Sequence, residues 1–183
     1  MLELYRVPFS LNVERVALAL AHKGLEVRSR VFAFEDREEI ERVSGQRLVP
    51  VIVDDGRAVS DSTEIIRYLE ERYPSSPLYP ASVALRAQVH VFVDWFDRVW
   101  KPLPNVIHGE LISPDPNQER VERLGLVMRS YLGWFEQLLD DRDYLAGAFS
   151  AADCAAWPFL RFATMRPEPE DNHLFHQILV ENQ

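Results

Sequence analysis

Three prolines within eight residues divide this chain into two parts. The segment reads Tyr73-Pro74-Ser75-Ser76-Pro77-Leu78-Tyr79-Pro80. Proline lacks a backbone N–H and fixes φ, so such a segment continues neither a helix nor a central strand. Strand and helix patterns alternate before it, whereas the pattern after it is helical almost throughout. We therefore expect two domains, residues 1–79 and 84–183, joined by this linker.

The first part predicts a small mixed sheet flanked by helices. Short strands are expected at Glu3–Val7, Glu26–Phe32, Val51–Val53 and Arg57–Val59. Helices are expected at Leu11–Lys23, after Asp36 with Glu39 in a capping box, and after Asp61. Asp54-Asp55-Gly56 is a hairpin signal, which makes the last strand pair antiparallel, while a helical crossover makes the first pair parallel. The expected order is β-α-β-α-β-β-α.

The second part predicts an all-helical domain. Apolar side chains recur there at helical spacing. Helices are expected from Val83 to Trp100 before Pro102 and Pro104, from Ser113-Pro114-Asp115-Pro116 to Leu139, and from Ser150 to Met165. A short amphipathic segment with Leu174, Phe175, Ile178 and Leu179 follows.

Charge and cysteine content exclude several classes of protein. The formal net charge of −9 disfavours nucleic acid or an anionic membrane as a partner. The single cysteine, Cys154, excludes a disulfide within the chain and a cysteine-rich metal site, and we interpret it as a small core residue. No charged leader precedes an apolar run, and no apolar stretch is long enough to span a bilayer, so we expect a cytoplasmic protein.

Ser10 stands where the first strand turns into the first helix. The unpaired N–H groups of a helix N-terminus and the helix dipole favour an anion there. A thiolate would fit such a site, with the hydroxyl as a further donor. The alternative interpretation is that Ser10 is only a helix cap.

Four local patterns together resemble the glutathione S-transferase superfamily. They are Ser10 with Arg15 and His22-Lys23-Gly24, Leu48-Val49-Pro50-Val51, Asp61-Ser62 at the start of a helix, and Gly147-Ala148-Phe149-Ser150-Ala151-Ala152-Asp153 before Trp157-Pro158. Each pattern is weak alone, but all four occur in the family's order across nearly the whole chain. The resemblance implies a thioredoxin-like domain with a mixed four-stranded sheet, followed by a helical domain.

The resemblance also implies a binding site for glutathione. As in the zeta, tau and omega classes, a serine at position 10 would donate a hydrogen bond to the glutathione sulfur. The backbone of Val49, beside a cis Pro50, would pair with the cysteinyl part. Asp61 and Ser62 would hold the γ-glutamyl group, and Ser150 with Asp153 would form a capping box for folding.

Further residues are candidates for substrate contact. Arg47 precedes Pro50 by three residues, where several relatives carry a lysine, and would hold the glycine carboxylate. Phe9, Phe96 and Trp100 are candidates for a hydrophobic electrophile site. The rings from Phe92 to Trp100 could equally be core residues, and Arg15 could support helix packing or pair with an acidic neighbour.

Two classes of function follow from these patterns. The first is a cytoplasmic, homodimeric detoxification enzyme that transfers small hydrophobic electrophiles to glutathione, with glutathione as co-substrate and no metal. The alternative is a non-catalytic module with the same fold, which Leu11 and Asn12 keep open because they depart from the family's usual residues. His173 and His176 are spaced like a pair of metal ligands, but no third ligand is evident. The chain ends early for this family, which predicts either a short variant or a C-terminal truncation that exposes apolar surface.

Overall fold

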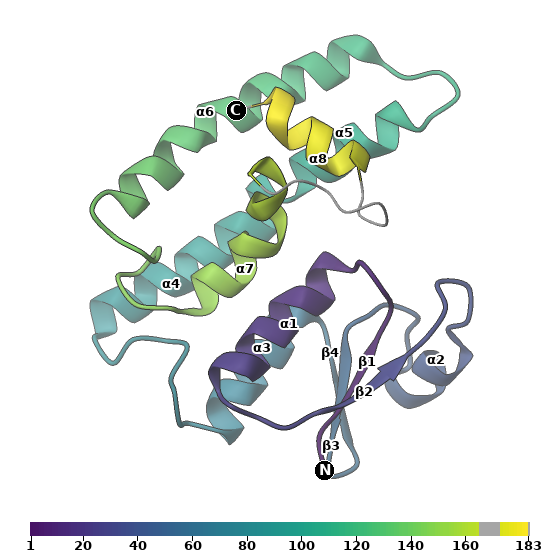
Figure 1. Cartoon of the computed structure of the whole chain (residues 1–183), viewed down its shortest axis with the longest axis vertical. Coiled ribbons are helices and arrows are strands. Elements are labelled where there is room, and N and C mark those ends of the chain that lie inside the picture. The colour runs from purple at the N-terminus through teal and green to yellow at the C-terminus, as the bar shows by residue number, and fades with distance from the viewer. Residues whose placement is uncertain (165–172, 183) are drawn as a thin grey trace. The chain divides into compact units, whose positions relative to one another are not determined.

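The computed structural model describes residues 1–164 and 173–182. The chain forms two compact units, Met1–Pro80 and Ala81–Gln183, and the boundary along the sequence follows Pro80, the last proline of the linker segment. The first unit contains strands and helices, whereas the described part of the second contains helices only (Figure 1).

Four strands form the sheet of the first unit. They are β1 (Glu3–Arg6), β2 (Arg28–Val31), β3 (Val51–Asp54) and β4 (Arg57–Ser60). Their order is β2-β1-β3-β4, with β1 and β2 parallel and both other pairs antiparallel. Asp55 and Gly56 have φ values of 47° and 86°, as a tight hairpin between β3 and β4 requires. The predicted mixed sheet is thus confirmed.

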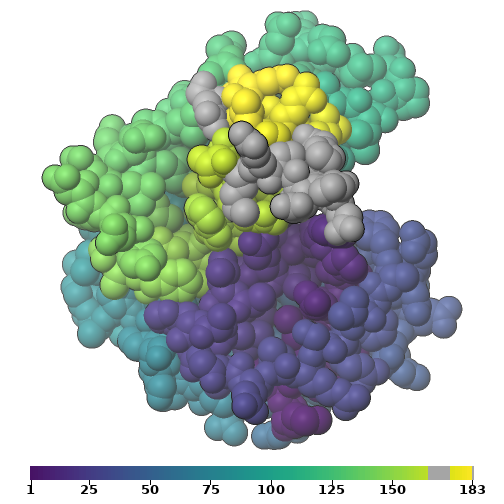
Figure 2. All heavy atoms as spheres, in the orientation of Figure 1, coloured from purple at the N-terminus to yellow at the C-terminus, as the bar shows by residue number. Residues whose placement is uncertain are grey.

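Helices cover the two faces of this sheet. α1 (Leu11–His22) and α3 (Ser62–Arg72) pack against each other, while α2 (Glu38–Ser44) lies apart from them (Figure 1). Tyr5 and Val51 share a core cluster with Ile40 of α2. Successive strand residues point to opposite faces, so the buried Leu4 and Ile52 point away from α2. Atoms of the N-terminal segment, in dark purple, show only in small areas on the face in Figure 2.

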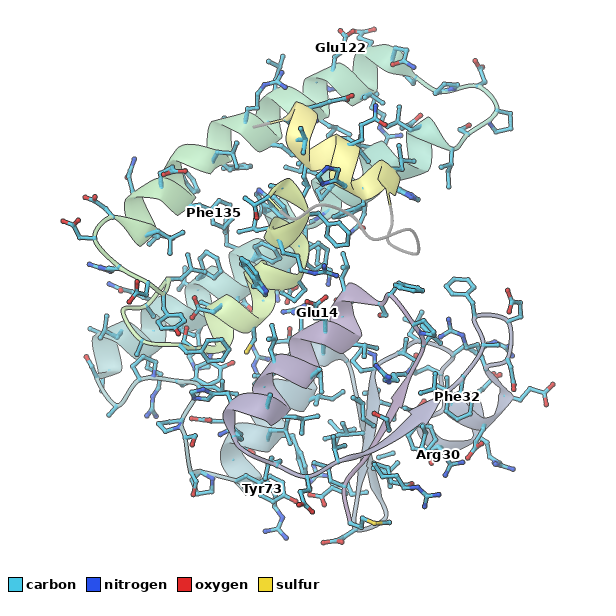
Figure 3. The ribbon with its side chains drawn as sticks, viewed as in Figure 1. Glu14, Arg30, Phe32, Tyr73, Glu122 and Phe135 are labelled. Carbon is cyan, nitrogen blue, oxygen red and sulfur yellow. The ribbon has the colours of Figure 1, made fainter. Side chains whose placement is uncertain are left out.

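The predicted capping box of α2 is wrong. Arg37 is its N-cap residue, and no side-chain capping bond forms there. Glu39 instead accepts a hydrogen bond from Arg30 of β2 at 2.6 Å. The ring of Phe32, just beyond β2, stacks on Tyr5 with centroids 5.6 Å apart (Figure 3). Contacts with the sheet therefore position α2.

The second unit is helical over its described length. Its elements are α4 (Val83–Trp95), η1 (Phe96–Trp100), α5 (Pro102–Leu111), α6 (Gln118–Leu139), α7 (Ala151–Leu160), η2 (Arg161–Ala163) and α8 (His173–Glu181). α5 packs on α6 and α8, and α7 packs on α4. An aromatic core holds them together, in which Phe135 of α6 points toward α4 and α7 (Figure 3). Phe96 and Trp100 stack there with centroids 5.0 Å apart.

Helix bounds in this unit differ from the prediction at three points. The helix that begins at Val83 changes to a π-helical turn at Phe96, and Pro102 then begins α5 at a position where its missing N–H costs nothing. Asn117, not the Ser113–Pro116 segment, caps α6, since its Oδ1 accepts from the N–H of Arg120 at 2.9 Å. α7 ends at Leu160, and Met165 lies outside the described residues.

The capping box at the start of α7 is confirmed. The carboxylate of Asp153 accepts from the N–H and the hydroxyl of Ser150 at 2.8 and 2.9 Å, and from the N–H of Leu145 at 3.0 Å. Cys154, the next residue, is fully buried, as expected of a core residue. Within residues 1–164 and 173–182, no helix has the length and apolar character needed to cross a membrane.

Candidate functional site

Loops from three strands converge at one edge of the sheet in the first unit. Tyr5 of β1 pairs with Val51 of β3, and Val51 pairs with Ser60 of β4. The residues that follow β1, precede β3 and follow β4 therefore lie at the same edge. These are the segments that carry Ser10, Val49 and Asp61.

Ser10 is the N-cap residue of α1. Its φ and ψ are −80° and 114°, and its Oγ accepts from the N–H of Val13 at 3.4 Å. Among the residues described, none accepts the Ser10 hydroxyl proton. The residue therefore caps the helix through its oxygen and keeps a donor, so capping is compatible with ligand binding.

A pocket of about 580 Å³ brings Ser10 together with three other predicted residues, Phe9, Arg47 and Val49. The lining residues come from the ends of β1, β2 and β3: Val7, Pro8, Phe9, Ser10, Ala33, Phe34, Arg37, Arg47, Leu48 and Val49. The peptide bond between Val49 and Pro50 is cis, as predicted. Phe9 is 63% exposed and has a φ of 59°, an unusual conformation for a bulky residue.

The positive charge in this pocket comes from two arginines. Arg47 pairs with Glu41 at 2.9 Å, and both side chains are about half exposed. Arg37 donates from Nε to the carbonyl oxygen of Phe34 at 2.7 Å, and its guanidinium lies 4.8 Å from the centre of the Phe34 ring. Sequence reasoning missed Arg37 and Phe34, because neither belongs to a motif and only the fold of the loop after β2 brings them to the pocket.

Asp61 and Ser62 lie at the same sheet edge but do not line this pocket. Asp61 has a φ of 72°, and its Oδ1 accepts from the N–H groups of Thr63 and Glu64 at 2.9 and 3.1 Å. Glu64 bonds to Arg67 at 2.6 Å, so its side chain takes part in an ion pair there. Asp61 thus caps α3 and stays exposed to solvent.

Arg15 connects α1 to the first turn of α3. Its Nη1 donates to Ser62 Oγ and its Nη2 to Thr63 Oγ1, each at 3.1 Å. The Arg15 side chain is only 1% exposed. It therefore supports helix packing, as one of its two predicted roles required, and the bonds to two hydroxyls are a feature that the sequence did not predict.

Phe96 and Trp100 belong to the aromatic core of the second unit. Their exposed fractions are 0% and 1%, and they line neither of the two pockets described here. Their burial gives no support to the prediction that they contact a substrate. Helical spacing placed both on one face, but it did not distinguish a core face from a pocket face.

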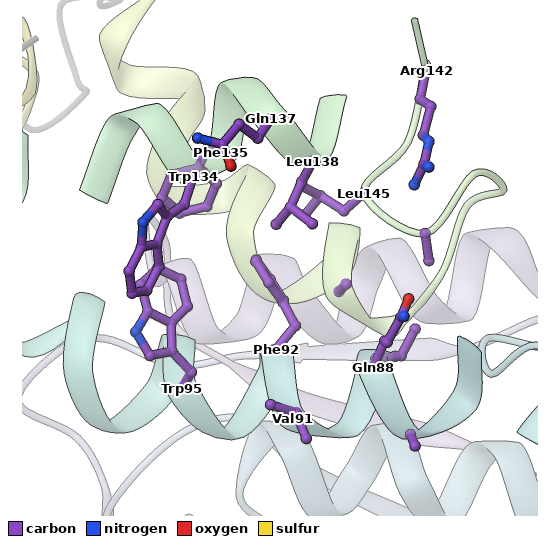
Figure 4. A pocket seen from close by; sticks show the side chains of 14 residues that line it. Gln88, Val91, Phe92, Trp95, Trp134, Phe135, Gln137, Leu138, Arg142 and Leu145 are labelled. Carbon is purple, nitrogen blue, oxygen red and sulfur yellow. The ribbon is translucent and has the colours of Figure 1, made fainter. Parts of the chain in front are cut away.

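The second unit has a pocket of its own, of about 870 Å³. It lies between α4, the end of α6 and the segment before α7, and Phe92, Trp95, Trp134 and Leu138 form much of its wall (Figure 4). Gln88 and Arg142 lie at one end of it (Figure 4). The pocket is therefore largely apolar with one polar end.

The spacing of His173 and His176, which resembles that of a pair of metal ligands, finds no further support. The ring Nδ1 of His176 contacts the carbonyl oxygen of Phe162, and the His173 side chain lies outside the described side chains. Over the described part of the chain, no three histidine, cysteine or acidic side chains group in a way that could hold a metal ion.

Comparison with known proteins gives matches for both units. A family model for the N-terminal domain of glutathione S-transferases matches residues 4–77, and a model for their C-terminal domain matches residues 118–176. Together these matches span more than two thirds of the chain.

Individual relatives are distant but cover most of the chain. FtsZ-localized protein A of Caulobacter vibrioides is 29% identical over 170 residues, which are 84% of this chain and 73% of that protein. A zeta-class glutathione S-transferase of Euphorbia esula is 29% identical over 151 residues, 74% of this chain and 66% of that protein. The crystal structure of a glutathione S-transferase from Rhodospirillum rubrum superposes with a TM-score of 0.74 at 28% identity, over 99% of this chain and 87% of that one.

Proposed function

This chain belongs to the glutathione S-transferase superfamily, and we propose that it binds glutathione at the edge of the first unit's sheet and activates the thiol for attack on a small electrophile. The observation that carries the proposal is the position of Ser10. Its hydroxyl stands at the N-terminus of α1 and shares a pocket with Val49 and Arg47.

Thiol activation follows from hydrogen bonding to sulfur. A free thiol has a pKa of about 8.5, so little thiolate exists at neutral pH. A charge-assisted hydrogen bond contributes roughly 1.5–3 kcal/mol, and one pKa unit corresponds to about 1.36 kcal/mol. The Ser10 hydroxyl, with the N-terminus of α1, would therefore lower the thiol pKa by about one to two units.

Glutathione would extend along the sheet edge. Its cysteinyl backbone would pair with Val49 beside the cis Pro50, and its γ-glutamyl group would reach Asp61 and Ser62 at the start of α3. Its glycine carboxylate would meet the arginine side of the pocket, where Arg37 and Arg47 both lie. This assignment keeps every glutathione contact within the first unit.

The electrophile would enter beside the exposed ring of Phe9, which adjoins Ser10. A hydrophobic compound suits such a surface. The proposal includes a homodimer that acts in the cytoplasm in detoxification, which rests on the family resemblance alone.

A second candidate function is a non-catalytic module that uses the same fold. Its support is the similarity to FtsZ-localized protein A, whose name refers to localisation with FtsZ and not to a transfer reaction. The capping bond between Ser10 and Val13 supports it as well, because capping alone explains a serine there.

Glutathione titration separates the two functions. Calorimetry measures binding, and thiolate absorbance in the ultraviolet against pH gives the pKa of the bound thiol. We expect a bound thiol pKa below 8.5 for the unmodified chain, and near 8.5 for Ser10→Ala with the dissociation constant changed only a few-fold. Asn117→Ala, which removes another helix cap, is the matched control and should leave both values unchanged. Binding without a lowered pKa would remove the thiol-activation role, and absence of binding would favour the non-catalytic module.

A further inference from the structure

The pocket of the helical unit plays no part in the proposed function. All of its lining residues lie between Ala87 and Ala152, so it belongs to the second unit alone. Phe135, Leu145 and Ala152 in its wall are buried and apolar. Its volume of about 870 Å³ is that of a site for a small organic molecule.

Two tryptophans form the aromatic end of this pocket. The rings of Trp95 on α4 and Trp134 on α6 have their centroids 5.5 Å apart. The ring of Phe92, about one helical turn before Trp95, has its centroid 5.7 Å from that of Trp95. Trp134 is 50% exposed, so part of its ring is open to a ligand. A flat aromatic group therefore finds rings on which to stack at this end.

Gln88 and Arg142 form the polar end of the pocket. In Figure 4 the Arg142 side chain points toward Gln88. Among the described residues, neither side chain takes part in an ion pair or a hydrogen bond. Asp141 and Asp143 flank Arg142 in the sequence but form no ion pair with it. The planar fork of a guanidinium matches a carboxylate, so this end suits an anionic group.

The course of the two helices determines the distance between these ends. α4 and α6 run in opposite directions along the pocket, because Trp95 contacts Trp134 at one end while Gln88 and Arg142 lie together at the other (Figure 4). Gln88 and Trp95 are about two helical turns apart, which corresponds to a rise of about 10 Å. A ligand that contacts both ends must therefore carry its carboxylate about 10 Å from the far edge of its aromatic group.

We propose that this pocket binds an elongated aromatic carboxylate of that length. The rings of the ligand stack on Phe92, Trp95 and Trp134, and its carboxylate pairs with Arg142. The amide of Gln88 supplies a further hydrogen-bond donor. The site shares no residue with the glutathione site, and it does not depend on the proposed function.

Calorimetry with three probes tests this assignment. 4-Phenylbenzoate has two linked rings and a carboxylate, benzoate has one ring, and 4-phenylbenzamide has two rings and no charge. We expect one molecule of 4-phenylbenzoate to bind per chain, at least about 10-fold more tightly than benzoate because it buries a second ring. It should bind about 5-fold more tightly than the amide, as one partly exposed ion pair implies. Saturating glutathione should leave these ratios and the dissociation constants unchanged.

Variants at the two ends separate the two contacts. Arg142→Gln should remove the preference for 4-phenylbenzoate over its amide. Arg123→Gln is the matched control, because Arg123 is an exposed arginine of the same unit outside the pocket, and it should keep that preference. Trp134→Ala should weaken 4-phenylbenzoate about 10-fold and leave benzoate nearly unchanged, since only the longer ligand reaches the aromatic end.

Several outcomes would overturn the inference while the glutathione proposal stands. They are the absence of saturable 4-phenylbenzoate binding at millimolar concentration, equal affinity for the acid and the amide, and full affinity in Trp134→Ala. Displacement by glutathione would overturn it too, because the ligand would then occupy the site in the first unit. Sedimentation velocity covers the remaining occupant. If 4-phenylbenzoate binding weakens as the chain self-associates, a second copy covers the pocket and the assignment to a small ligand fails.

Discussion

The ammonium of Lys23 lies 2.7 Å from Oε2 of Glu70, and the Lys23 side chain has no exposed surface. The same ammonium donates to the carbonyl oxygen of Tyr73 at 2.9 Å, and the Glu70 carboxylate accepts from the N–H of Leu78 at 3.0 Å. Lys23, at the C-terminal end of α1, and Glu70 of α3 thus both form hydrogen bonds with backbone groups of the linker segment. The proline-rich segment is thereby bonded to the first unit by a buried ion pair.

We predict that Lys23→Met destabilises the chain by about 3–5 kcal/mol, because it leaves a carboxylate without its cation and several carbonyls without their donor. Urea unfolding followed by circular dichroism measures this. The double variant with Lys23→Met and Glu70→Gln should lose less free energy of unfolding than the two single variants lose in sum. Arg28→Met is the control, since Arg28 is 61% exposed and 3.6 Å from Glu3, and it should cost under about 1 kcal/mol. Equal losses in the two variants would contradict a structural role for the buried pair.

Asp153→Ala should destabilise the second unit by about 2 kcal/mol or more. The change removes the acceptor for the N–H groups of Leu145 and Ser150 and for the Ser150 hydroxyl, all of which are buried. Scanning calorimetry of the full chain measures the effect. Asn117→Ala removes an exposed cap and should cost only about 1 kcal/mol. The interpretation fails if the two costs are the same.

Stability should fall at alkaline pH because of Tyr73. The hydrogen bond to the Asp54 carboxylate at 2.7 Å, together with burial, raises the pKa of Tyr73 from 10.0 to about 12. The folded state then holds a proton that the unfolded state releases, so this contribution is complete below pH 10 and is lost as the pH rises to 12. Tyr73→Phe should flatten the decline of unfolding free energy between these pH values. Tyr144→Phe, at an exposed ring, is the control and should leave the decline of unfolding free energy with pH as it is in the unmodified chain.

Arg37→Gln should weaken glutathione binding by about 2–5-fold, as loss of one partly exposed ion pair implies. The effect should shrink at high salt because exposed charges are screened. Arg47→Gln should have a similar or smaller effect, since Glu41 already neutralises part of its charge. Calorimetry at two ionic strengths measures the loss of affinity and its salt dependence for both variants. Arg42→Gln is the control, because Arg42 is 76% exposed and outside the pocket; an equal loss there would show a non-specific effect of charge.

Local chemistry predicted the fold of the first unit well. The Asp54-Asp55-Gly56 turn determines the register of β3 and β4, and the crossover through α1 determines that β2 runs parallel to β1. The capping of α2 was not predictable, because Glu39 pairs with Arg30 on a strand nine residues earlier. In the second unit, Pro102 indicated a break, yet its fixed φ also suits a first helical turn.

The candidate site likewise contains residues that local sequence rules predict and residues whose positions depend on the tertiary fold. Ser10, Val49 and Asp61 could be predicted as candidates because each stands at a helix start or before a proline, where local rules apply. Arg37 stands in a loop, and no periodic pattern determines where a loop side chain lies. Arg15 occurs at an ordinary helical position, so its contact with Ser62 depends on how two helices pack. Burial of Phe96 likewise depends on packing.

The aromatic core of the second unit makes its unfolding visible separately. All four tryptophans, Trp95, Trp100, Trp134 and Trp157, lie after residue 80. Intrinsic tryptophan fluorescence is therefore a label of the helical unit alone, with the buried Trp100 indole emitting at shorter wavelength than the half-exposed Trp134. Every strand in the described part of the chain belongs to the other unit. Fluorescence and far-ultraviolet dichroism recorded in one melt then tell whether the two units lose their structure together or one after the other.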